Sequence, residues 1–361
     1  MVLKSLVATT LKTTLYGSGV LALVRRAGGS GSRLPVLQYH SVSSDGVYRT
    51  PSIAVSPALF ERQMAFVAAH YRLVSLDDVV DCIERRRPFP PRAVAITFDD
   101  GYLDNYTAAL PILRRHRLTA TFFVTAGPVV RGERFWVSWL RTAVLSAADL
   151  SGLATAELIP PALLSRARGD REQIVEAITR RMNRSGRADR HDLLEQAARA
   201  LRIDDVPAPG AEELVRPEHV RELVRAGMTI GSHTVSHPNL PSLTAAEASS
   251  ELAESKGLLE QITGQPVRHL AYPGGPEAGR PIFTRETMAL ARRAGYRSAS
   301  TSLRQAVALD SDAFALGRYD VHERMGFSGF AFRLEQPRLA WLTPRRERLT
   351  DPPTSGGTVL G

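Results

Sequence analysis

The chain has 361 residues, of which 43% are hydrophobic, enough for one large domain, or one domain with an insertion, around a substantial core. The formal charge is +9, but the basic residues are spread along the chain near acidic ones and form no stripe with aromatic residues, which argues against a nucleic-acid partner. The single cysteine, Cys82, excludes an internal disulfide and a CxxC metal site, so metal ligands must be histidine and carboxylate side chains.

The N-terminal segment, residues 1–33, predicts an amphipathic helix followed by the Gly/Ser linker AGGSGSR. Residues 1–27 are apolar on one side, but Lys12 interrupts a run that is too short to span a bilayer comfortably. The segment also lacks the cleavage site of a signal peptide. It fits equally a helix on a membrane surface, anchored by Arg25 and Arg26, and a helix packed on the domain. We therefore expect a protein that is cytoplasmic or peripheral to the membrane.

From residue 34 to residue 342, apolar strand-like segments alternate with amphipathic helical ones. This alternation is typical of βα units that build a parallel sheet or barrel. The predicted strands are PVLQY (35–39), YRLVS (71–75), AVAITF (93–98), ATFFVT (120–125), MTIGS (228–232), VRHLAY (267–272), YRSAST (296–301) and a stretch at 315–321.

Two segments depart from the alternation. The stretch at about 131–216 is helical and loop-like with no evident strand, which predicts a helical insertion between two barrel units. It could cover the site or form an interface. The tail at 343–361 contains PPTSGGT and is predicted to be disordered.

Polar and ionisable residues stand where several predicted strands end. In a parallel α/β fold, functional side chains gather at the carboxyl ends of the strands. The residues in this position are His40, Asp99 with Asp100, His233, and Tyr272 with Pro273 and Gly274.

The sequence HTVSH places His233 and His237 four residues apart, so one helical turn would let both imidazoles reach one metal ion. The pair alone is weak evidence, because two histidines fall at this spacing by chance. Joined to an aspartate from the strand-terminal pair, it forms a set of two imidazoles and one carboxylate. Such a set leaves coordination positions open, as catalytic rather than structural metal sites do.

Asp99 and Asp100 follow a buried strand directly, in AITFDDGYLDNY. Adjacent residues of an extended chain point to opposite sides, so the two carboxylates cannot easily bind the same ion. One of them can bind the metal while the other takes a proton from an attacking water. The alternative for DDG is an Asx turn followed by a glycine with positive φ.

In combination, TFDDGY (97–102), HTVSH (233–237) and YPGG (272–275) resemble the motifs of the polysaccharide deacetylase family, also called the NodB-homology or carbohydrate esterase 4 family. The resemblance covers about residues 34–130 and 217–325 and leaves the insertion outside. It implies an α/β fold, a distorted (β/α)7-type barrel, that removes acetyl groups from N-acetylated sugars. It also implies a divalent metal ion as cofactor, usually zinc.

Carried over to this chain, the resemblance makes Asp99 the catalytic base and Asp100, His233 and His237 the metal ligands. The residue after the proline of the third motif, Gly274, would donate its backbone N–H to the oxyanion. A backbone donor survives the loss of the usual aromatic side chain there.

The arginine that begins the third motif in the family, and orients the base, is replaced here by Ala271. Arg318, in LGRYD, is a candidate replacement, and a surface or core ion pair is the alternative for it. Arg318, Tyr272 and Pro273 are placed among the expected substrate-binding residues, although Tyr272 could also simply pack under the site.

The general acid of the family is a histidine in a late LxH motif, which is missing near the C-terminus of this sequence. The sequence VLQYHS looks like that motif moved to the front, as in the circularly permuted branch that resembles exopolysaccharide deacetylases. A barrel is closed, so a strand lost from the end of the chain can be supplied from its beginning. His40 is therefore the candidate acid; His322, in RYDVHE, is the alternative, and His40 could also merely pack.

The resemblance implies an N-acetylated glycan as the substrate, either a polysaccharide or a lipid-linked glycan. One alternative is a catalytically silent carbohydrate-binding barrel, to which the missing arginine gives some weight. Another is a deacetylase or amidase that acts on a small non-glycan substrate. The complete set of two aspartates and two histidines argues for an enzyme, because a binding protein has little use for both metal ligands and a free base.

Overall fold

The structure is a computed structural model that describes residues 14, 16–26, 31–44, 53–132, 135–167, 169–183, 185–203, 214–274 and 282–339. Most of the predicted N-terminal helix, part of the linker and the tail at 343–361 lie outside these residues.

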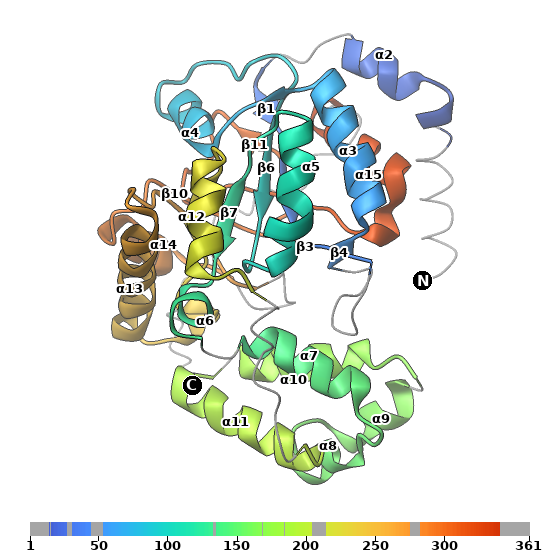
Figure 1. Ribbon diagram of the computed structural model, residues 1–361, viewed down its shortest axis with the longest axis vertical. Coiled ribbons are helices and arrows are strands. Elements are labelled where there is room, and N and C mark those ends of the chain that lie inside the picture. Colours follow the sequence, from blue (N-terminus) through green and yellow to red (C-terminus); the bar gives the residue numbers. More distant parts are fainter. Residues whose placement is uncertain are drawn as a thin grey trace, which may run out of the picture.

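A parallel sheet forms the centre of the molecule (Figure 1). The short strand β5 (Arg72–Leu73) pairs with the beginning of β6 (Ala93–Phe98) and lies beside the main path of the sheet. All eight predicted strands contribute to this sheet, and the predicted fold class is confirmed. The strands of the main path, in spatial order, are β10 (Ser298–Ser300), β9 (His269–Ala271), β8 (Thr229–Ser232), β7 (Thr121–Val124), β6 (Ala93–Phe98), β2 (Val36–Tyr39) and β12 (Tyr319–Asp320).

The segment that leads into β12 closes the barrel. Leu316 pairs with Ser300 of β10, and three residues later Tyr319 pairs with Leu37 of β2. One stretch of chain therefore joins the two edges of the sheet, and the result is a distorted barrel. Outside the barrel path, β1 (Arg33–Leu34) pairs with β11 (Val307–Ala308), and β3 (Ser41–Val42) pairs with β4 (Ala54–Val55).

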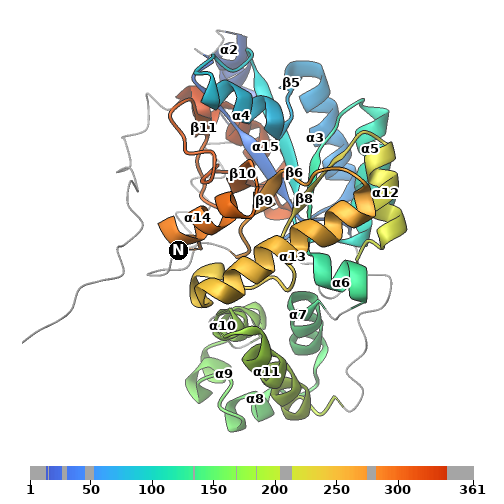
Figure 2. The same cartoon turned by 90° about the vertical axis from the view of Figure 1, so that its left-hand side faces the viewer.

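Helices surround the sheet and cover its outer face (Figure 2). Val94, Ile96 and Phe98 of β6 belong to the main core between strands and helices, where Phe98 stacks on Phe122. The helices that surround the sheet are α3 (Pro57–His70), α4 (Leu76–Glu84), α5 (Leu110–Arg115), α6 (Ala126–Arg131), α12 (Pro217–Arg225), α13 (Ala245–Thr263), α14 (Arg285–Arg293) and α15 (Gly326–Glu335). Shorter helical turns are η1 (Asn105–Ala109), η2 (Leu240–Ser242), η3 (Glu323–Met325) and η4 (Gln336–Leu339).

The interior of the barrel changes from apolar to polar along the strands. Successive strand residues face opposite sides, so the residues of β6 that alternate with the outward-facing Val94, Ile96 and Phe98 point into the barrel. Ala95 and Phe123 lie in an apolar cluster that fills the amino end. Thr97 and Arg318 follow, with the Arg318 guanidinium 5.4 Å from the centre of the Phe123 ring. The sequence therefore places ionisable side chains at the carboxyl end of the barrel.

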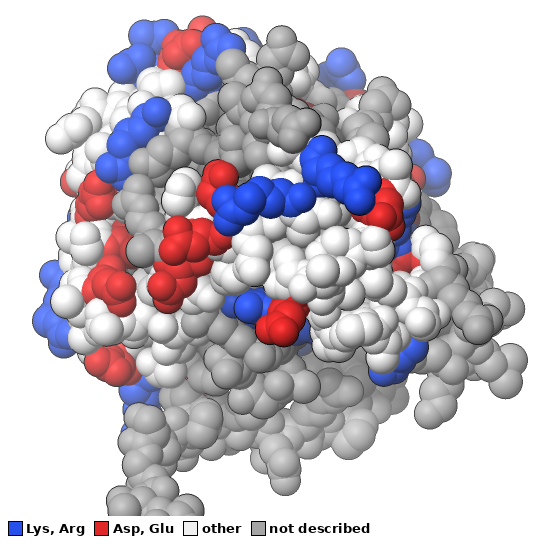
Figure 3. Space-filling model, turned by 90° about the horizontal axis from the view of Figure 1, so that it is seen from below, with Lys and Arg blue, Asp and Glu red and all other residues white. Residues whose placement is uncertain are grey.

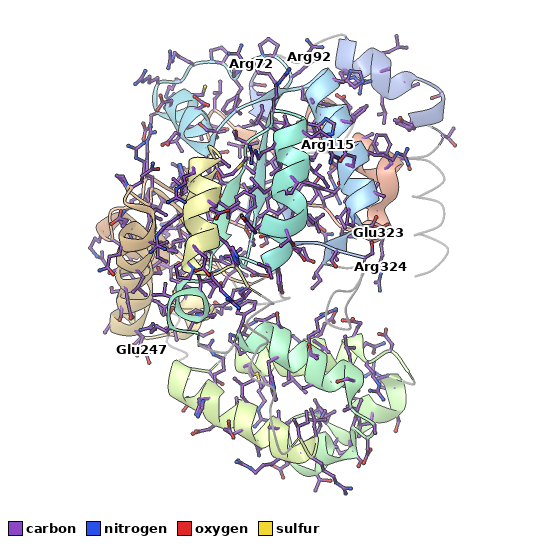
Figure 4. The ribbon with its side chains drawn as sticks, in the orientation of Figure 1. Arg72, Arg92, Arg115, Glu247, Glu323 and Arg324 are labelled. Carbon is purple, nitrogen blue, oxygen red and sulfur yellow. The ribbon has the colours of Figure 1, made fainter. Side chains whose placement is uncertain are left out.

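A second group of helices, called here the helical unit (residues 135–201), lies on the carboxyl side of the barrel. Arg72 and Arg92, at the amino ends of β5 and β6, lie at the opposite end of the molecule (Figure 4). The unit has its own hydrophobic core, which includes Trp139, Leu140 and Ile178. On the face that it presents in Figure 3, basic and acidic side chains are interspersed. Its helices are α7 (Trp136–Ser146), α8 (Ser151–Thr155), α9 (Pro161–Ala167), α10 (Glu172–Met182) and α11 (Arg187–Ala200).

Near the N-terminus, helix α2 (Val20–Arg26) packs on the barrel. Leu21 is buried beside Ala331 of α15, and the Arg25 guanidinium lies 4.8 Å from the centre of the Phe66 ring. The described part of the N-terminal segment is thus a packed helix, one of the two alternatives that the sequence left open. Among the described residues, no helix is long and apolar enough to cross a membrane.

Candidate metal centre

Three buried side chains converge at the carboxyl ends of β6 and β8: Asp100, His233 and His237. Asp100 Oδ1 lies 3.4 Å from Nε2 of His233 and 3.4 Å from Nε2 of His237. One ligand atom from each of the three residues lies within 4.8 Å of the others. Among the described residues, this is the one group of three that could hold a metal ion.

The backbone turns sharply at Asp100, so its side chain does not point in the direction that a regular strand would give it. Asp100 has a φ of +75° and Gly101 a φ of +86°, both in the left-handed region. Aspartate tolerates this region better than most residues, and glycine adopts it without strain. At Gly101 a Cβ would also come within 3.3 Å of Val124. The two carboxylates can therefore face the same end of the barrel although they are adjacent in sequence.

The two histidines are brought together by a loop rather than by the helical turn that their spacing would allow, because residues 233–237 contain no helix. Thr234 and His237 both have positive φ, of +66° and +56°. The His237 N–H donates to Thr234 Oγ1 at 3.1 Å, which closes the loop, and the two imidazole centroids lie 4.8 Å apart. The spacing of four residues thus serves a metal site without helical geometry.

The donor set fits a divalent metal ion. His233 Nδ1 lies 2.9 Å from the carbonyl oxygen of Ala271 and donates its proton there, which leaves Nε2, the nitrogen on the Asp100 side, to bind a metal ion. Burial alone would raise the pKa of Asp100, but the adjacent imidazoles of His233 and His237 hold it well below its ordinary value. Two imidazole nitrogens and an ionised carboxylate are ligands typical of a catalytic zinc site.

Asp99 is held on both oxygens beside the cluster. Arg318 donates from Nη1 to Oδ1 at 2.6 Å and from Nη2 to Oδ2 at 2.7 Å, and Gln38 donates to Oδ2 at 2.7 Å. Arg318 also donates to Thr97 Oγ1 and to the Thr301 carbonyl. Burial would raise the pKa of Asp99, but the Arg318 charge overcomes this effect and lowers it. Asp99 is therefore an ionised and oriented carboxylate.

Arg318 is fully buried, with an exposed fraction of 0%. It lies behind Asp99 rather than at a surface that a substrate could reach, which corrects its placement among the substrate-binding residues. Its two hydrogen bonds to the Asp99 carboxylate are compatible with the other role considered for it, that of an arginine that orients this carboxylate, and this role stays a prediction.

The YPGG motif follows β9 and reaches the same end of the barrel. Tyr272 is buried, its hydroxyl donates to the Phe314 carbonyl at 3.1 Å, and its ring stacks on Phe283, so it packs under the site. Pro273 is buried, and Gly274 has a φ of +100° with its carbonyl accepting from Ser302 Oγ at 3.0 Å. The oxyanion role of the Gly274 N–H stays a prediction.

The two candidate acids lie on neighbouring strands. His40 follows β2 directly, is half-buried, and is near enough to Asp99 and Asp100 to help lower the pKa of each carboxyl. His322 follows β12, one strand further from the aspartates, and its Nε2 lies 3.5 Å from Asp320 Oδ2. The assignment of the general acid to His40 or to His322 stays a prediction.

Sequence reasoning missed Gln38 and Glu251. Gln38 is a polar residue in an otherwise apolar strand and lies two positions before His40, on the same face, which could have identified it. Glu251 accepts hydrogen bonds from the N–H groups of Val235 and Ser236 at 2.8 and 2.9 Å and so holds the histidine loop. It is one of several charged residues in α13, and nothing in the sequence marks it out.

Comparison with known proteins gives a consistent result. The sequence model of the polysaccharide deacetylase family matches residues 86–299. YxkH of Bacillus subtilis (strain 168), which is named as a polysaccharide deacetylase, is 23% identical over 305 residues, 84% of this chain and 77% of its own length.

Two solved structures share the fold. The deacetylase PplD of Streptococcus pyogenes, in complex with acetate, has a TM-score of 0.55 and 18% identity. The match covers 99% of its chain and 86% of this chain. IcaB of Ammonifex degensii has a TM-score of 0.53 and 18% identity, with 97% of its chain and 85% of this chain covered.

Proposed function

The chain belongs to the polysaccharide deacetylase family, and on this premise we propose that it is a metal-dependent hydrolase of N-acetylated glycans. It removes N-acetyl groups from N-acetylhexosamine units of a polysaccharide or of a lipid-linked glycan. The observation that carries the proposal is the buried cluster of Asp100, His233 and His237 with the oriented carboxylate of Asp99 next to it.

Asp100, His233 and His237 hold the metal ion, which we propose to be zinc. A divalent ion bound there polarises the acetamide carbonyl and makes water more acidic. The tautomer of His233, the ionisation of Asp100 and the burial of all three residues support this assignment.

Asp99 is the general base. It takes the proton of the water that attacks the acetamide carbon, and it stays ionised between turnovers because Arg318 and Gln38 stabilise the carboxylate. The Gly274 N–H donates to the oxyanion that forms on the carbonyl oxygen. Cleavage of the C–N bond then releases acetate, and a protonated side chain supplies the proton that the departing sugar amine needs.

His40 is the proposed donor of that proton. Its strand, β2, lies directly beside β6, and its nearness to both aspartates supports this role over His322. Strand β2 comes from the beginning of the chain and lies between β6 and β12, and this order also supports membership of the circularly permuted branch.

The test is acetate release from a panel of N-acetylated oligosaccharides by the metal-reconstituted protein, with Asp99→Asn as the control. We expect release by the natural protein, and none by Asp99→Asn although it still binds the metal. A fully active Asp99→Asn variant would refute the base assignment. Binding of oligosaccharides without release would favour the silent carbohydrate-binding barrel, and release only from small acetylated compounds would favour the non-glycan alternative.

Peripheral membrane contact through residues 1–27 is a separate proposal. Tyr16, Val20 and Leu23 are the exposed large hydrophobic residues of the described chain, and all three belong to this segment. Co-sedimentation with anionic vesicles tests it. Deletion of residues 1–27 should abolish binding, and equal binding of both forms would exclude this contact.

A further inference from the structure

The two histidines of the cluster are held in different ways. His233 donates from Nδ1 to the Ala271 carbonyl of the barrel, which fixes its ring. Nδ1 of His237 is buried and has no hydrogen-bond partner among the described residues. Its ring instead meets Phe135 edge-on, with centroids 5.5 Å apart, and Trp136, with centroids 6.1 Å apart. Trp136 belongs to the core of the helical unit, whereas Phe135, which directly precedes α7, is part of the hydrophobic core of the barrel.

Ser236, the residue before His237, connects the barrel to the helical unit. From the barrel side, Glu251 accepts from the Ser236 N–H at 2.9 Å and from its hydroxyl at 2.6 Å. From the helical unit, Arg190 Nη2 donates to Ser236 Oγ at 2.8 Å, and Trp136 Nε1 donates to the Ser236 carbonyl at 3.1 Å. The polar groups of Ser236 are thus satisfied by two parts of the molecule at once.

Arg190 and Trp136 come from α11 and α7 and converge on this one residue. The Arg190 side chain is buried, with 3% of the residue exposed, and its guanidinium lies 5.3 Å from the centre of the Trp136 ring. The Ser236 hydroxyl stands between this cation and the buried carboxylate of Glu251, so opposite charges face each other across it. A buried charge is tolerated where it is hydrogen-bonded and compensated in this way.

We propose that the helical unit positions the metal ligand His237, with Trp136 and Arg190 as positioning residues that act through Ser236. The loop contains left-handed backbone at Thr234 and His237, which persists only where its surroundings enforce it. Glu251 holds the loop from one side, and Trp136 and Arg190 hold it from the other. The inference rests on the proposed metal-dependent function and adds that the helical unit sets the affinity for the metal.

The test measures zinc affinity of the full-length protein by competition with a chromophoric chelator, independently of activity. Arg190→Met keeps the aliphatic stem and removes the hydrogen bond to Ser236. Loss of a partner that orients a metal ligand typically weakens binding about 10- to 100-fold, and we expect a loss in this range. Trp136→Phe, which keeps an aromatic ring but not the N–H, should weaken binding in the same direction. It also serves as the second variant if Arg190→Met does not fold.

Arg171→Met is the matched control. Arg171 also belongs to the helical unit, and its Nη1 donates to the carbonyls of Val144 and Leu145, away from the histidine loop. Its loss should lower the thermal stability of the metal-free protein but leave zinc affinity unchanged. If Arg190→Met and Trp136→Phe behave like this control, their role is merely structural and the proposal is overturned.

A double variant tests whether Arg190 acts through Ser236. In a Ser236→Ala background, Arg190→Met should cause no further loss of zinc affinity, because the hydrogen bond is already gone. A full additional loss would overturn the proposed route. The Co²⁺-substituted protein should show altered visible absorption in Arg190→Met but not in Arg171→Met, because this absorption reports ligand geometry.

The outcomes also separate this inference from the proposed function. If the natural protein binds no zinc, the metal centre and the proposed function fail together. If it binds zinc and releases acetate while the variants bind zinc equally well, only the positioning role fails.

Discussion

Asp99 and Asp100 are neighbours in sequence but have different partners. Asp99 accepts from Arg318 and Gln38, so hydrogen-bond donors hold both of its oxygens. Asp100 faces the imidazoles of His233 and His237 instead. A regular strand would point the two side chains to opposite sides of the sheet, and the left-handed conformation at Asp100 instead lets both reach the carboxyl end of the barrel, each with its own partners.

Removal of Arg318 should destabilise the fold strongly. Arg318→Met leaves the Asp99 carboxylate buried without its cation, which we expect to lower the free energy of unfolding by about 3–5 kcal/mol. Adding Asp99→Asn removes the uncompensated charge and should restore part of this loss. Urea unfolding of the two single variants and the double variant measures the coupling. Arg304→Met is the control, because the Arg304–Asp320 pair is exposed on its arginine side and should contribute about 1 kcal/mol or less. Additive effects of Arg318→Met and Asp99→Asn would contradict the expectation.

The general acid can be identified by substitution at His40 and at His322. His40→Ala should lower the turnover number by about 10²–10⁴-fold, the usual contribution of general acid–base catalysis. His322→Ala should have little effect, because its strand is one position further from the aspartates. Initial rates of acetate release measure both, and zinc affinity measured in parallel should be unchanged in either variant. A larger loss in His322→Ala would reverse the assignment.

The residues of the metal cluster could be predicted because each lies in a short motif at the end of a strand. The partners of Asp99 could not be identified with the same certainty. Arg318 lies 219 residues from Asp99 in sequence, and only closure of the barrel brings them together. The contacts of Trp136 and Arg190 with Ser236 depend on how two helices of the insertion pack, which neither motif nor periodicity reports.

At the level of secondary structure, the strands were predictable and the histidine loop was not. Buried parallel strands are short apolar runs, and each of the eight segments predicted on this basis contributes to the sheet. HxxxH spacing is compatible with a helical turn and with other conformations. The choice between them follows from the hydrogen bonds of Thr234 and Glu251, which involve groups of the folded chain.

Helix α4 is joined to the amino ends of β9 and β10 by charged side chains, and this connection should depend on pH. Asp77 Oδ1 lies 2.8 Å from Arg297 Nη1 and 3.6 Å from His269 Nε2. The neighbouring His269 and Arg297 hold the pKa of Asp77 below its ordinary value, although partial burial alone would raise it. A lowered pKa in the folded state means that the folded chain favours the ionised form, so the stabilisation is present above the unfolded pKa.

Asp77→Asn should therefore lower the free energy of unfolding at neutral pH by about 1 kcal/mol, because the carboxylate is partly exposed. The difference from the natural protein should stay constant down to about pH 5 and shrink as the pH falls below the unfolded pKa of about 4. Urea unfolding at several pH values measures this difference. In an Arg297→Met background the effect should be smaller. A difference that grows toward acid pH would contradict the sign of the shift.

On the scale of the whole molecule, two hydrophobic cores meet at the metal centre. The barrel core and the core of the helical unit are separate clusters. Ser236 and His237 contact both parts, through Glu251 on one side and through Trp136 and Arg190 on the other. The histidine loop is therefore a connection between the barrel and the insertion as well as a source of a metal ligand.

Metal binding should consequently slow hydrogen exchange in the helical unit as well as in the barrel. A ligand that binds only the folded state stabilises it by about 4 kcal/mol at a thousandfold excess over its dissociation constant, and the gain is felt by segments that open together with the site. Peptides that cover residues 233–237, the first turn of α7 and the part of α11 around Arg190 should gain protection when zinc replaces a chelator in exchange measurements followed by mass spectrometry. Peptides from α9 should change much less, because none of the described contacts of the histidine loop involves this helix.

Asp100→Asn, which lacks a ligand, should show no zinc-dependent change in any of these peptides. If zinc protects the loop but leaves α7 and α11 unchanged, the helical unit opens independently of the metal centre, and the connection through Ser236 does not couple the two parts.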